Sequence, residues 1–475
     1  MSNLETFDVV VIGGGPAGAT AANDLAKLGR SVCLLDRAGR IKPCGGAIPP
    51  QAMREFDLPE SVLANRVTSA RMISPSDRKV DMPIENGYVG LVDREHFDEW
   101  LRARAAESGA TRRTGTFEKI ERDTDGTAIV VYRPGQGRND APCERIRARA
   151  IIGADGANSF VGKHYVPGYE TVKYVSAYHE ILRTPEGFDN SRCDVYYQGD
   201  ISPDFYGWVF PHGDTVSVGV GTAVPGFSLR AACTELSRRA GLADAEILRR
   251  EGAPIPLEPL KCWDNGRDIV LAGDAAGVVA PASGEGIYYA LAGGRLAGEA
   301  VEAFLATGKA SALKLARKRF MKAHGKVFWV LGIMQRFWYS SDKRRERFVS
   351  LCADPDIQYL TWEAYMNKRL VKARPGAHLR IFLKDMGHLL GIVSPRSRSI
   401  LTPEKPCNMA DFFASGRVID VILVMMLIEG LALTLYHRHT GKGIPPAGLA
   451  GFLLSGFVLL LTLRAALTDA WWGWI

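Results

Sequence analysis

The sequence predicts an α/β protein with a parallel sheet, an antiparallel sheet, a basic helical segment and a C-terminal hairpin of two apolar helices. Three observations predict this architecture. A strand-like run at 7–12 leads through a glycine-rich turn into an alanine-rich helix at 19–28, and a second strand follows at 32–35, which is a βαβ opening. Residues 66–95 and 170–222 alternate apolar and polar positions between turns, as antiparallel strands do. Two long apolar runs lie near the end of the chain.

Composition excludes several classes of protein. Of 475 residues, 47% are hydrophobic, 23% are charged and 50 are glycine, which excludes a disordered, collagen-like or small disulfide-rich protein. The eight cysteines form no C-x-x-C pair and show no zinc-ligand spacing, so we expect reduced thiols and no metal site. The first apolar run is short and follows acidic residues, so we do not expect a signal peptide.

The apolar runs at 418–436 and 447–463 predict a transmembrane hairpin over 417–465. A helix of 19 residues at ~1.5 Å per residue roughly matches a ~30 Å hydrocarbon core. Three tryptophans follow, as at a bilayer interface: Trp471, Trp472 and Trp474.

An amphipathic pair of helices lying on the membrane surface is the alternative to a spanning hairpin. Asp420 and Glu429 lie in the first run, and a charge at mid-membrane costs roughly 2.5–3.5 kcal/mol. The many Leu, Ile, Val and Met residues of that run can offset one such penalty. Arg438 and Lys442 in the connecting loop argue against an orientation that returns the C-terminus to the cytoplasm.

Gly13, Gly15 and Gly18 form a G-x-G-x-x-G motif directly after a strand and at the start of a helix. The first glycine permits a tight turn, the second lets backbone approach a pyrophosphate, and the third brings helix against strand. The helix N-terminus supplies N–H groups and a positive dipole. Asp36 ends the second strand, where a carboxylate accepts hydrogen bonds from ribose hydroxyls. Together these features predict a Rossmann-like dinucleotide site.

Three further motifs lie downstream of the glycine turn. Residues 269–276 form a buried strand ending in Gly-Asp and are followed at 281–286 by a helix start, residues 152–157 are IGADGA, and Arg94 lies in VDREHF. Together they resemble the two-dinucleotide-fold flavoproteins of the aromatic-hydroxylase and geranylgeranyl-reductase group. The resemblance implies bound FAD, with Asp274 at its ribitol and pyrophosphate and Arg94 along its phosphates. The implied FAD site comprises Gly13, Gly15, Ala17, Gly18, Asp36, Arg37, Cys44, Gly45, Gly46, Arg94, Asp155, Gly273, Asp274, Gly284 and Gly286.

Two motifs narrow the resemblance to the geranylgeranyl reductases of bacteriochlorophyll synthesis. Residues 40–46 are RIKPCGG and residues 205–211 are FYGWVFP, and the runs 54–94 and 350–393 are also similar to members from phototrophic bacteria. The similarity covers residues 5–395 and leaves the hairpin outside it. It implies reduction of a geranylgeranyl chain to phytyl, either on the bacteriochlorophyll ester or on the free diphosphate.

The electron donor, partners and location are expectations from the same resemblance. The chain has no second G-x-G-x-x-G motif, so NADPH would dock transiently, or reduced ferredoxin would deliver the electrons. We expect membrane lipid and bacteriochlorophyll synthase as partners and no nucleic acid. The expected location is the bacterial inner (intracytoplasmic) membrane, with the catalytic domain on the cytoplasmic side.

The residues themselves fit reduction of an isolated trisubstituted alkene, which needs a hydride and a proton. Tyr206, Trp208 and Phe210 share one face of a predicted strand, and aromatic faces ease positive charge on a tertiary carbon. Cys44 lies in a glycine-containing loop that lets backbone come close to a cofactor. We therefore expect Cys44, Tyr206 and Trp208 to be catalytic. An aromatic core stripe and a buried inert thiol are the alternatives.

The proton donor stays open at this point. Tyr206, His212 and Glu285 are candidates, each with a structural role as its alternative, and an ordered water fits equally well. His437 and His439 at the predicted membrane edge could ligate a chlorin magnesium, although solvated histidines are the ordinary interpretation.

Two other function classes remain. Flavin monooxygenases share the FAD motifs, although the Pro-Cys-Gly-Gly loop and the Tyr-Gly-Trp strand favour a reductase; substrate-dependent oxygen consumption would reverse that judgement. A flavin-containing membrane tether for pigment-synthesis partners is the non-enzymatic class. It predicts that deleting 411–475 abolishes pigment assembly while a mutation at Cys44 or Trp208 has no effect.

The net charge of +7 is unevenly distributed. Residues 314–398 hold 19 Lys+Arg and 6 Asp+Glu, a local balance of +13, so the remainder nets −6. This basic segment suits an anionic membrane face, a diphosphate or a ferredoxin, with solvated helix faces as the alternative. The predicted domains are an FAD-binding domain (1–65, 96–165 and 264–313), an antiparallel-sheet substrate domain (66–95 and 166–263), a basic helical segment (314–400), a linker (401–416) and the hairpin (417–465).

Overall fold

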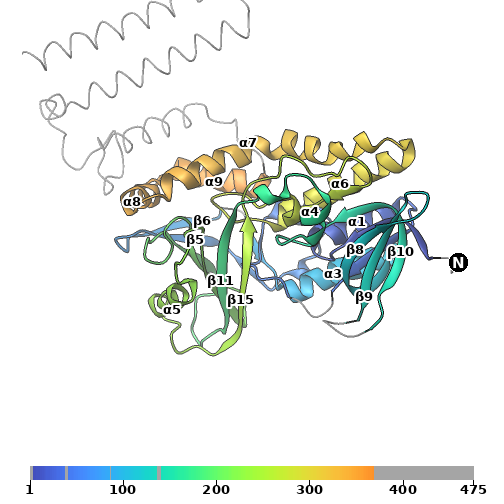
Figure 1. Cartoon of the computed structure of the whole chain (residues 1–475). Helices are drawn as coiled ribbons and strands as arrows, with labels where there is room; N and C mark the ends of the chain where they lie inside the picture. Colours follow the sequence, from blue (N-terminus) through green and yellow to red (C-terminus); the bar gives the residue numbers. More distant parts are fainter. Residues whose placement is uncertain (1–3, 38–40, 86, 136–140, 369–475) are drawn as a thin grey trace, which may run out of the picture. The chain divides into compact units, whose positions relative to one another are not determined.

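The computed structural model describes residues 4–37, 41–85, 87–135 and 141–368 (Figure 1). The chain divides into two compact units, 1–371 and 372–475, and the described residues belong to the first. The predicted linker, the predicted hairpin, and His437 and His439 therefore lie outside the described residues. In the described part of the chain, no helix is both long and apolar enough to cross a bilayer.

A six-stranded sheet forms the nucleotide-binding half. β1 pairs in parallel with β2 and β10, β2 with β8, and β10 with β16, while β9 pairs antiparallel with β8 and β10. Strands β1, β2 and β16 are almost wholly buried because helices cover the sheet, as in parallel sheets generally. The strands are β1 (Thr6–Ile12), β2 (Val32–Asp36), β8 (Thr111–Arg122), β9 (Ala128–Pro134), β10 (Glu144–Gly153) and β16 (Ile269–Leu271).

A seven-stranded sheet forms the other half. Its neighbours are antiparallel except β12 and β5, which are parallel. In spatial order the strands are β15 (Ile247–Pro256), β11 (Tyr174–Arg183), β14 (Thr215–Thr222), β13 (Gly207–Pro211), β12 (Arg192–Tyr196), β5 (Ser69–Ile73) and β6 (Lys79–Pro83). These strands lie inside the segments predicted for the substrate domain. A third, short sheet contains β3 (Ala47–Ile48), β7 (Val89–Leu91) and β4 (Asn65–Val67).

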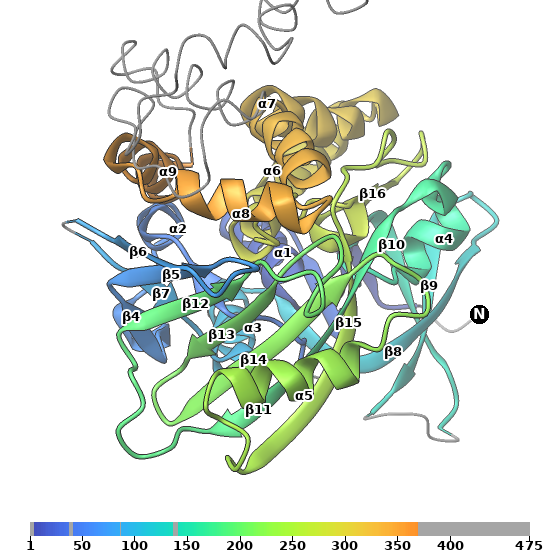
Figure 2. The same cartoon turned by 90° about the vertical axis from the view of Figure 1, so that its left-hand side faces the viewer.

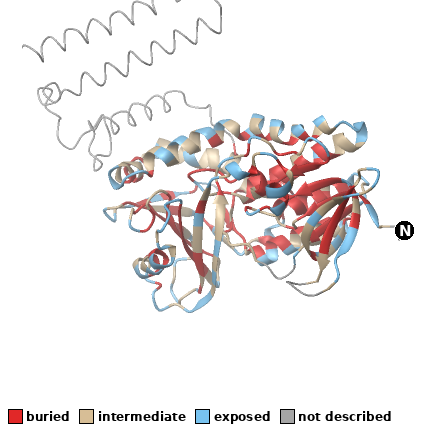
Figure 3. Cartoon of the chain, in the orientation of Figure 1, coloured by how far each residue is buried: buried red, intermediate tan, exposed pale blue. Residues whose placement is uncertain are grey.

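Helix α7 packs against the apolar cores of both halves. Figures 1 and 2 show α6 and α7 along one side of the molecule, and α7 contributes Phe320 and Phe328 to the core of the first half and Leu331 and Met334 to the apolar core of the second. The outward face of α7 is exposed (Figure 3). The helices are α1 (Pro16–Lys27), α2 (Pro50–Glu55), α3 (Arg94–Glu107), α4 (Phe160–Tyr165), α5 (Leu229–Arg239), α6 (Ile287–Thr307), α7 (Leu315–Trp338), α8 (Asp342–Leu351) and α9 (Pro355–Asn367). Short 3-10 turns lie at Glu60–Val62, Tyr169–Thr171, Gly273–Ala276 and Ala310–Lys314.

The first helix begins earlier than the sequence suggests. We expected it from residue 19, but α1 starts at Pro16, inside the glycine motif. Proline suits the first turn of a helix because its missing N–H has no helical partner there. The N-cap is Gly15, and no side chain caps the helix. The N–H groups of the first turn are therefore left without a side-chain partner at the edge of the sheet.

Helix α6 packs closely on α1 because glycine occurs at their crossing. A Cβ added at Gly294 would overlap the backbone carbonyl of Ala17, whereas one added at Gly298 would meet Ala21 at an ordinary 3.7 Å. The close packing of α6 on α1 therefore fixes the position of α1, and the first turn of α1 faces the nucleotide site.

We expect Gly294→Ala to destabilise the protein by about 1–3 kcal/mol, because the new methyl group must push α1 and α6 apart. Gly298→Ala is the matched control on the same helix, and the better helix propensity of alanine should stabilise it by up to about 1 kcal/mol. Thermal unfolding of both variants tests this. A Gly294→Ala protein as stable as Gly298→Ala would show that the crossing is not tightly constrained.

Candidate active site

A cavity of about 420 Å³ lies where the carboxyl ends of β1, β2 and β10 meet. The turn from Gly13 to Ala17 lines it, and a Cβ added at Gly15 would meet no atom within 4 Å, so the backbone there faces open space. Gly13 has φ +104°, and an added Cβ would overlap the Ala154 carbonyl, so only glycine fits that position. An uncapped helix N-terminus and an open backbone turn form a cradle suited to a phosphate group.

Three charged side chains, Asp36, Arg37 and Arg102, line this cavity where β2 ends. Asp36 lies at the end of β2, 3.2 Å from the guanidinium of Arg102 on α3. Burial raises the pKa of Asp36 above its usual value, although the Gly14 N–H and Arg102 act in the opposite direction. Arg37 follows, exposed at the rim. A carboxylate at this point can accept hydrogen bonds from ribose hydroxyls.

Asp155 lines the same cavity, but its carboxylate is engaged within the fold. It accepts hydrogen bonds from the Phe160 and Val161 N–H groups at 2.7 and 3.1 Å, and from the Ser159 hydroxyl. The side chain thus holds the first turn of α4, and the backbone of the Ala154–Asp155–Gly156 turn is what borders the cavity.

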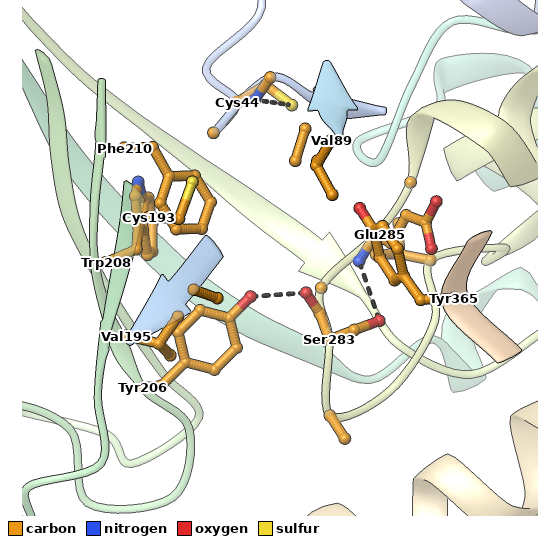
Figure 4. Close-up of a pocket in the computed structure, with 18 of the residues that line it drawn as sticks. Cys44, Val89, Cys193, Val195, Tyr206, Trp208, Phe210, Ser283, Glu285 and Tyr365 are labelled. Carbon is orange, nitrogen blue, oxygen red and sulfur yellow. Dashed lines mark hydrogen bonds between the residues drawn. The ribbon is translucent and has the colours of Figure 1, made fainter. Parts of the chain in front are cut away.

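A second cavity, of about 390 Å³, lies between the seven-stranded sheet and helices α7 to α9. Tyr206, Trp208 and Phe210 form one wall, and Figure 4 shows them on the strand side, opposite the loop with Ser283 and Glu285. All three rings thus line one cavity, as expected for alternate residues on one face of a strand. Its other walls are largely apolar and include Met82, Val89, Val195, Leu331, Met334 and Trp362.

The loop containing Cys44 forms one end of the apolar cavity (Figure 4). The Cys44 sulfur accepts the Gly46 N–H at 3.3 Å, and His212 Nε2 lies 3.2 Å from the Gly45 carbonyl oxygen. Gly46 has φ +75°, and an added Cβ would lie 2.5 Å from the Val92 carbonyl oxygen. The loop therefore needs glycine at position 46 to pass between Val92 and His212.

The two cavities meet at a shared wall. The residues that line both are Pro16, Lys42, Arg94, Ala253, Pro254, Asp274 and Ala290. Lys42 forms an ion pair with Asp274, and buried Arg94 binds Asp98 through two hydrogen bonds of 2.9 and 2.7 Å. Burial alone would lower the pKa of Arg94, but the Asp98 carboxylate and the Cys44 sulfur raise it. Both cations at the junction are thus balanced by carboxylates.

Most of the expected cofactor residues line one of the two cavities, and two do not. Gly18 and Gly273 lie behind the wall: a Cβ at Gly18 would overlap the Gly13 carbonyl oxygen, and one at Gly273 would lie 2.7 Å from the Ala17 Cβ. Both shape the wall without facing the cavity. His212 also lies behind the lining, beside the Gly45–Gly46 loop.

A buried hydrogen-bond chain lies behind Trp208 and has no signature in the sequence. The Trp208 indole N–H donates to Ser217 Oγ at 3.1 Å, Ser217 Oγ lies 3.1 Å from His179 Nδ1, and His179 Nε2 lies 2.9 Å from Glu251. These residues come from β13, β14, β11 and β15, which are neighbours only in the folded sheet. The sequence also gave no signal for Lys368, which forms a buried ion pair with Glu285.

The residues present fit FAD. The cradle at Gly13–Gly15 suits its pyrophosphate, Asp36 suits the ribose, and Asp274 and Arg94 border the junction. The cavity continues from there toward the aromatic wall, as a dinucleotide with a reactive ring at one end requires.

The fold and its two cavities define an FAD-binding flavoprotein, and residues 6–182 match the family model described as an FAD binding domain. The chain is 58% identical over 393 residues to the geranylgeranyl diphosphate reductase of Rhodobacter capsulatus, covering 82% of this chain and 99% of that protein. It is 37% identical to that of Synechocystis, covering 80% and 97%. A geranylgeranyl bacteriochlorophyll reductase-like structure from Thermoplasma acidophilum has the same fold, with TM-score 0.67, 22% identity and coverage of 78% and 99%. The chain belongs to the geranylgeranyl diphosphate reductase family.

We expect the His212 ring to make the protein less stable in acid. Burial lowers the pKa of His212 to about 4, so between pH 6.5 and 4 the unfolded chain binds a proton that the folded chain does not. Stability should fall by about 2 kcal/mol from this group between pH 7 and pH 5.

Denaturant unfolding of His212→Gln at several pH values tests this. The variant keeps a donor for the Gly45 carbonyl and should show a flatter pH dependence than the unmodified protein. His96→Gln, at an exposed position on α3, is the control and should retain the full slope. Parallel curves for the His212→Gln and unmodified proteins would contradict the assignment.

Proposed function

We propose that this protein reduces isolated C=C bonds of a geranylgeranyl chain to give a phytyl chain, with FAD as cofactor, in bacteriochlorophyll synthesis. One observation carries the proposal: an apolar cavity walled by Tyr206, Trp208 and Phe210 meets the dinucleotide cavity at a shared wall. A volume of about 390 Å³ lies within the range of small-molecule sites. The names of the curated relatives support the same substrate class.

Reduced FAD, when bound, supplies the hydride. The protein supplies the environment in which an unactivated alkene accepts it. Trp208 and Tyr206 present aromatic faces that stabilise positive charge developing on a tertiary carbon, and the apolar walls exclude water that would capture that carbon. The hydrogen-bond chain from Trp208 through Ser217 to His179 fixes the indole ring.

The cavity lining bears on the form of the substrate. Among the described lining residues the Lys and Arg side chains are Lys42 and Arg94, and both are paired with carboxylates. Inside the cavity there is therefore no unpaired Lys or Arg, within the described part of the chain, that could bind a diphosphate. The same holds for a chlorin carboxyl group. We propose that the apolar chain enters and the head group stays outside, so that both the free diphosphate and the bacteriochlorophyll ester can be substrates. NADPH is the proposed donor, with reduced ferredoxin as its alternative.

We further propose that the protein works at the cytoplasmic face of the bacterial inner membrane, anchored by a hairpin at 417–465 and beside bacteriochlorophyll synthase. The outward face of α7 supports membrane contact: Trp329 is 69% exposed and Ile333 is 47% exposed, and exposed Lys322 and Lys326 precede them. Apolar and basic side chains on one face suit an anionic lipid surface. A geranylgeranyl lipid would reach the cavity from that surface.

Anaerobic incubation of the purified protein with NADPH and geranylgeranyl-bacteriochlorophyll or geranylgeranyl diphosphate should yield products heavier by two, four or six hydrogens. Mass analysis of the products checks this, with reduced ferredoxin as the second donor. No gain of hydrogen with either donor would overturn the proposal. Substrate-dependent oxygen consumption by the reduced protein would indicate a monooxygenase instead.

Removing residues 401–475 should release the protein from membranes. The full chain should float with liposomes and resist alkaline carbonate extraction, because a spanning helix inserts almost irreversibly, whereas the shortened chain should be extracted. Extraction of both chains to the same extent would contradict the hairpin. Retained reduction of geranylgeranyl diphosphate by the shortened chain would separate anchoring from catalysis.

A further inference from the structure

Alkene reduction needs a proton as well as a hydride, and the hydrogen bonds around the apolar cavity distinguish the candidate acids. The Tyr206 hydroxyl donates to the Ser283 carbonyl at 2.6 Å, so its proton is engaged (Figure 4). Burial also raises the pKa of Tyr206 far above its ordinary value. The Cys44 sulfur accepts the Gly46 N–H at 3.3 Å, a contact that holds this side chain in its own loop.

His212 is equally unsuited to donate a proton to the cavity. Burial lowers its pKa to about 4, so the ring is neutral near pH 7 and carries one N–H. Because Nε2 lies 3.2 Å from the Gly45 carbonyl, that N–H is donated to the loop. The ring positions the Cys44–Gly46 loop from behind.

Glu285 differs from these groups. It lines the apolar cavity, is 9% exposed, and lies in the loop that leads into α6. One carboxylate oxygen, Oε2, binds Lys368, and the other, Oε1, has no hydrogen-bond partner among the described residues. Burying a carboxyl oxygen in an apolar wall without a hydrogen-bond partner destabilises the fold. Such a group therefore calls for a functional explanation. Figure 4 shows Glu285 and Tyr365 on the opposite side of the view from Trp208 and Phe210.

Lys368 reaches Glu285 from the end of α9. Its side chain is 3% exposed, and its ammonium lies 3.9 Å from the centre of the Tyr365 ring and 5.6 and 5.8 Å from those of Tyr288 and Tyr289. Three aromatic rings thus surround the ammonium nitrogen, and Glu285 is the carboxylate that pairs with it. The pair joins the loop before α6 to the residue that follows α9.

Two other titratable groups near the pair, His324 and Glu55, place no charge in direct contact with Glu285 or Lys368. His324 on α7 is neutral near pH 7 because burial lowers its pKa to about 4. Glu55 on α2 is separated from the pair by Tyr288, whose hydroxyl binds it at 3.0 Å. Burial raises the pKa of Glu285 and lowers that of Lys368, so the two groups favour one shared proton over two separate charges.

We propose that Glu285, positioned by Lys368, donates the proton that reduction of the alkene requires; this rests on the proposed function. In the step the alkene π bond breaks, and the tertiary carbon, on which positive charge develops, receives the hydride that reduced FAD supplies. The other carbon receives the proton as the Oε1–H bond of Glu285 breaks. Lys368 stabilises the carboxylate left behind, and a proton from water restores the acid through Lys368.

Single-turnover kinetics of Glu285→Gln test this. Protein with FAD reduced by dithionite is mixed anaerobically with geranylgeranyl diphosphate, and flavin reoxidation and product mass are followed. The variant should bind and reduce FAD as before but reoxidise with substrate about 100-fold more slowly, a typical loss for a missing general acid. Glu302→Gln on α6 is the matched control: it also breaks an ion pair, with Arg30, but neither residue lines a cavity, and the variant should behave as the unmodified protein.

Two readouts separate proton donation from a structural role. The reoxidation rate of the unmodified protein should fall as pH rises, and Glu285→Gln should lack that limb. Formate should restore the rate of Glu285→Ala, more strongly at lower pH, because formic acid can occupy the vacated space. Lys368→Met should lower the maximal rate and move the falling limb to higher pH, since Glu285 then loses the cation that favours its charged form.

The outcomes are distinguishable. If neither geranylgeranyl diphosphate nor geranylgeranyl-bacteriochlorophyll reoxidises the unmodified protein, the proposed function fails. If it is reoxidised and Glu285→Gln stays within about threefold of it, with the pH limb intact, Glu285 is not the donor. If Glu285→Gln does not hold FAD, an unchanged pH profile in Lys368→Met together with no formate rescue overturns the proposal.

Discussion

The architecture depends on the close approach of three backbone segments at the glycine turn. Gly18 lets α1 lie on the Gly13 carbonyl, Gly13 lets the turn lie on Ala154 at the end of β10, and Gly294 lets α6 lie on Ala17. A side chain at any of these points would separate the segments. Because α6 is preceded by the loop with Ser283 and Glu285, the same contacts that form the phosphate cradle also place one wall of the apolar cavity.

The site separates charge from apolar surface along its length. Polar backbone and carboxylates surround the first cavity, paired charges occupy the junction, and aromatic and aliphatic side chains surround the second. The pairing of Lys42 with Asp274 and of Arg94 with Asp98 avoids unpaired buried charge at the junction. An alkene in the apolar cavity can therefore lie near a polar cofactor while the water around that cofactor stays outside the apolar cavity.

The sequence predicted the features that local geometry enforces. The glycine turn, the acid after β2 and the aromatic stripe before Pro211 follow from backbone room and strand period, which neighbouring residues determine. It could not predict what packing brings together: Lys368 and Glu285 lie 83 positions apart, and the chain behind Trp208 crosses four strands. The start of α1 and the capping role of Asp155 were missed because a motif gives residue types and not hydrogen-bond partners.

The shared wall between the cavities has a thermodynamic consequence. A cofactor bound along the first cavity would border the second, so the prenyl chain and the cofactor would contact the same residues, among them Pro16 and Ala290. Whatever free energy the cofactor adds to substrate binding, the substrate must return to cofactor binding, because the two affinities form one closed cycle. Cofactor retention would therefore change with occupancy of the apolar cavity by as much as the two ligands are coupled, and a chain that cannot be reduced would produce the same change.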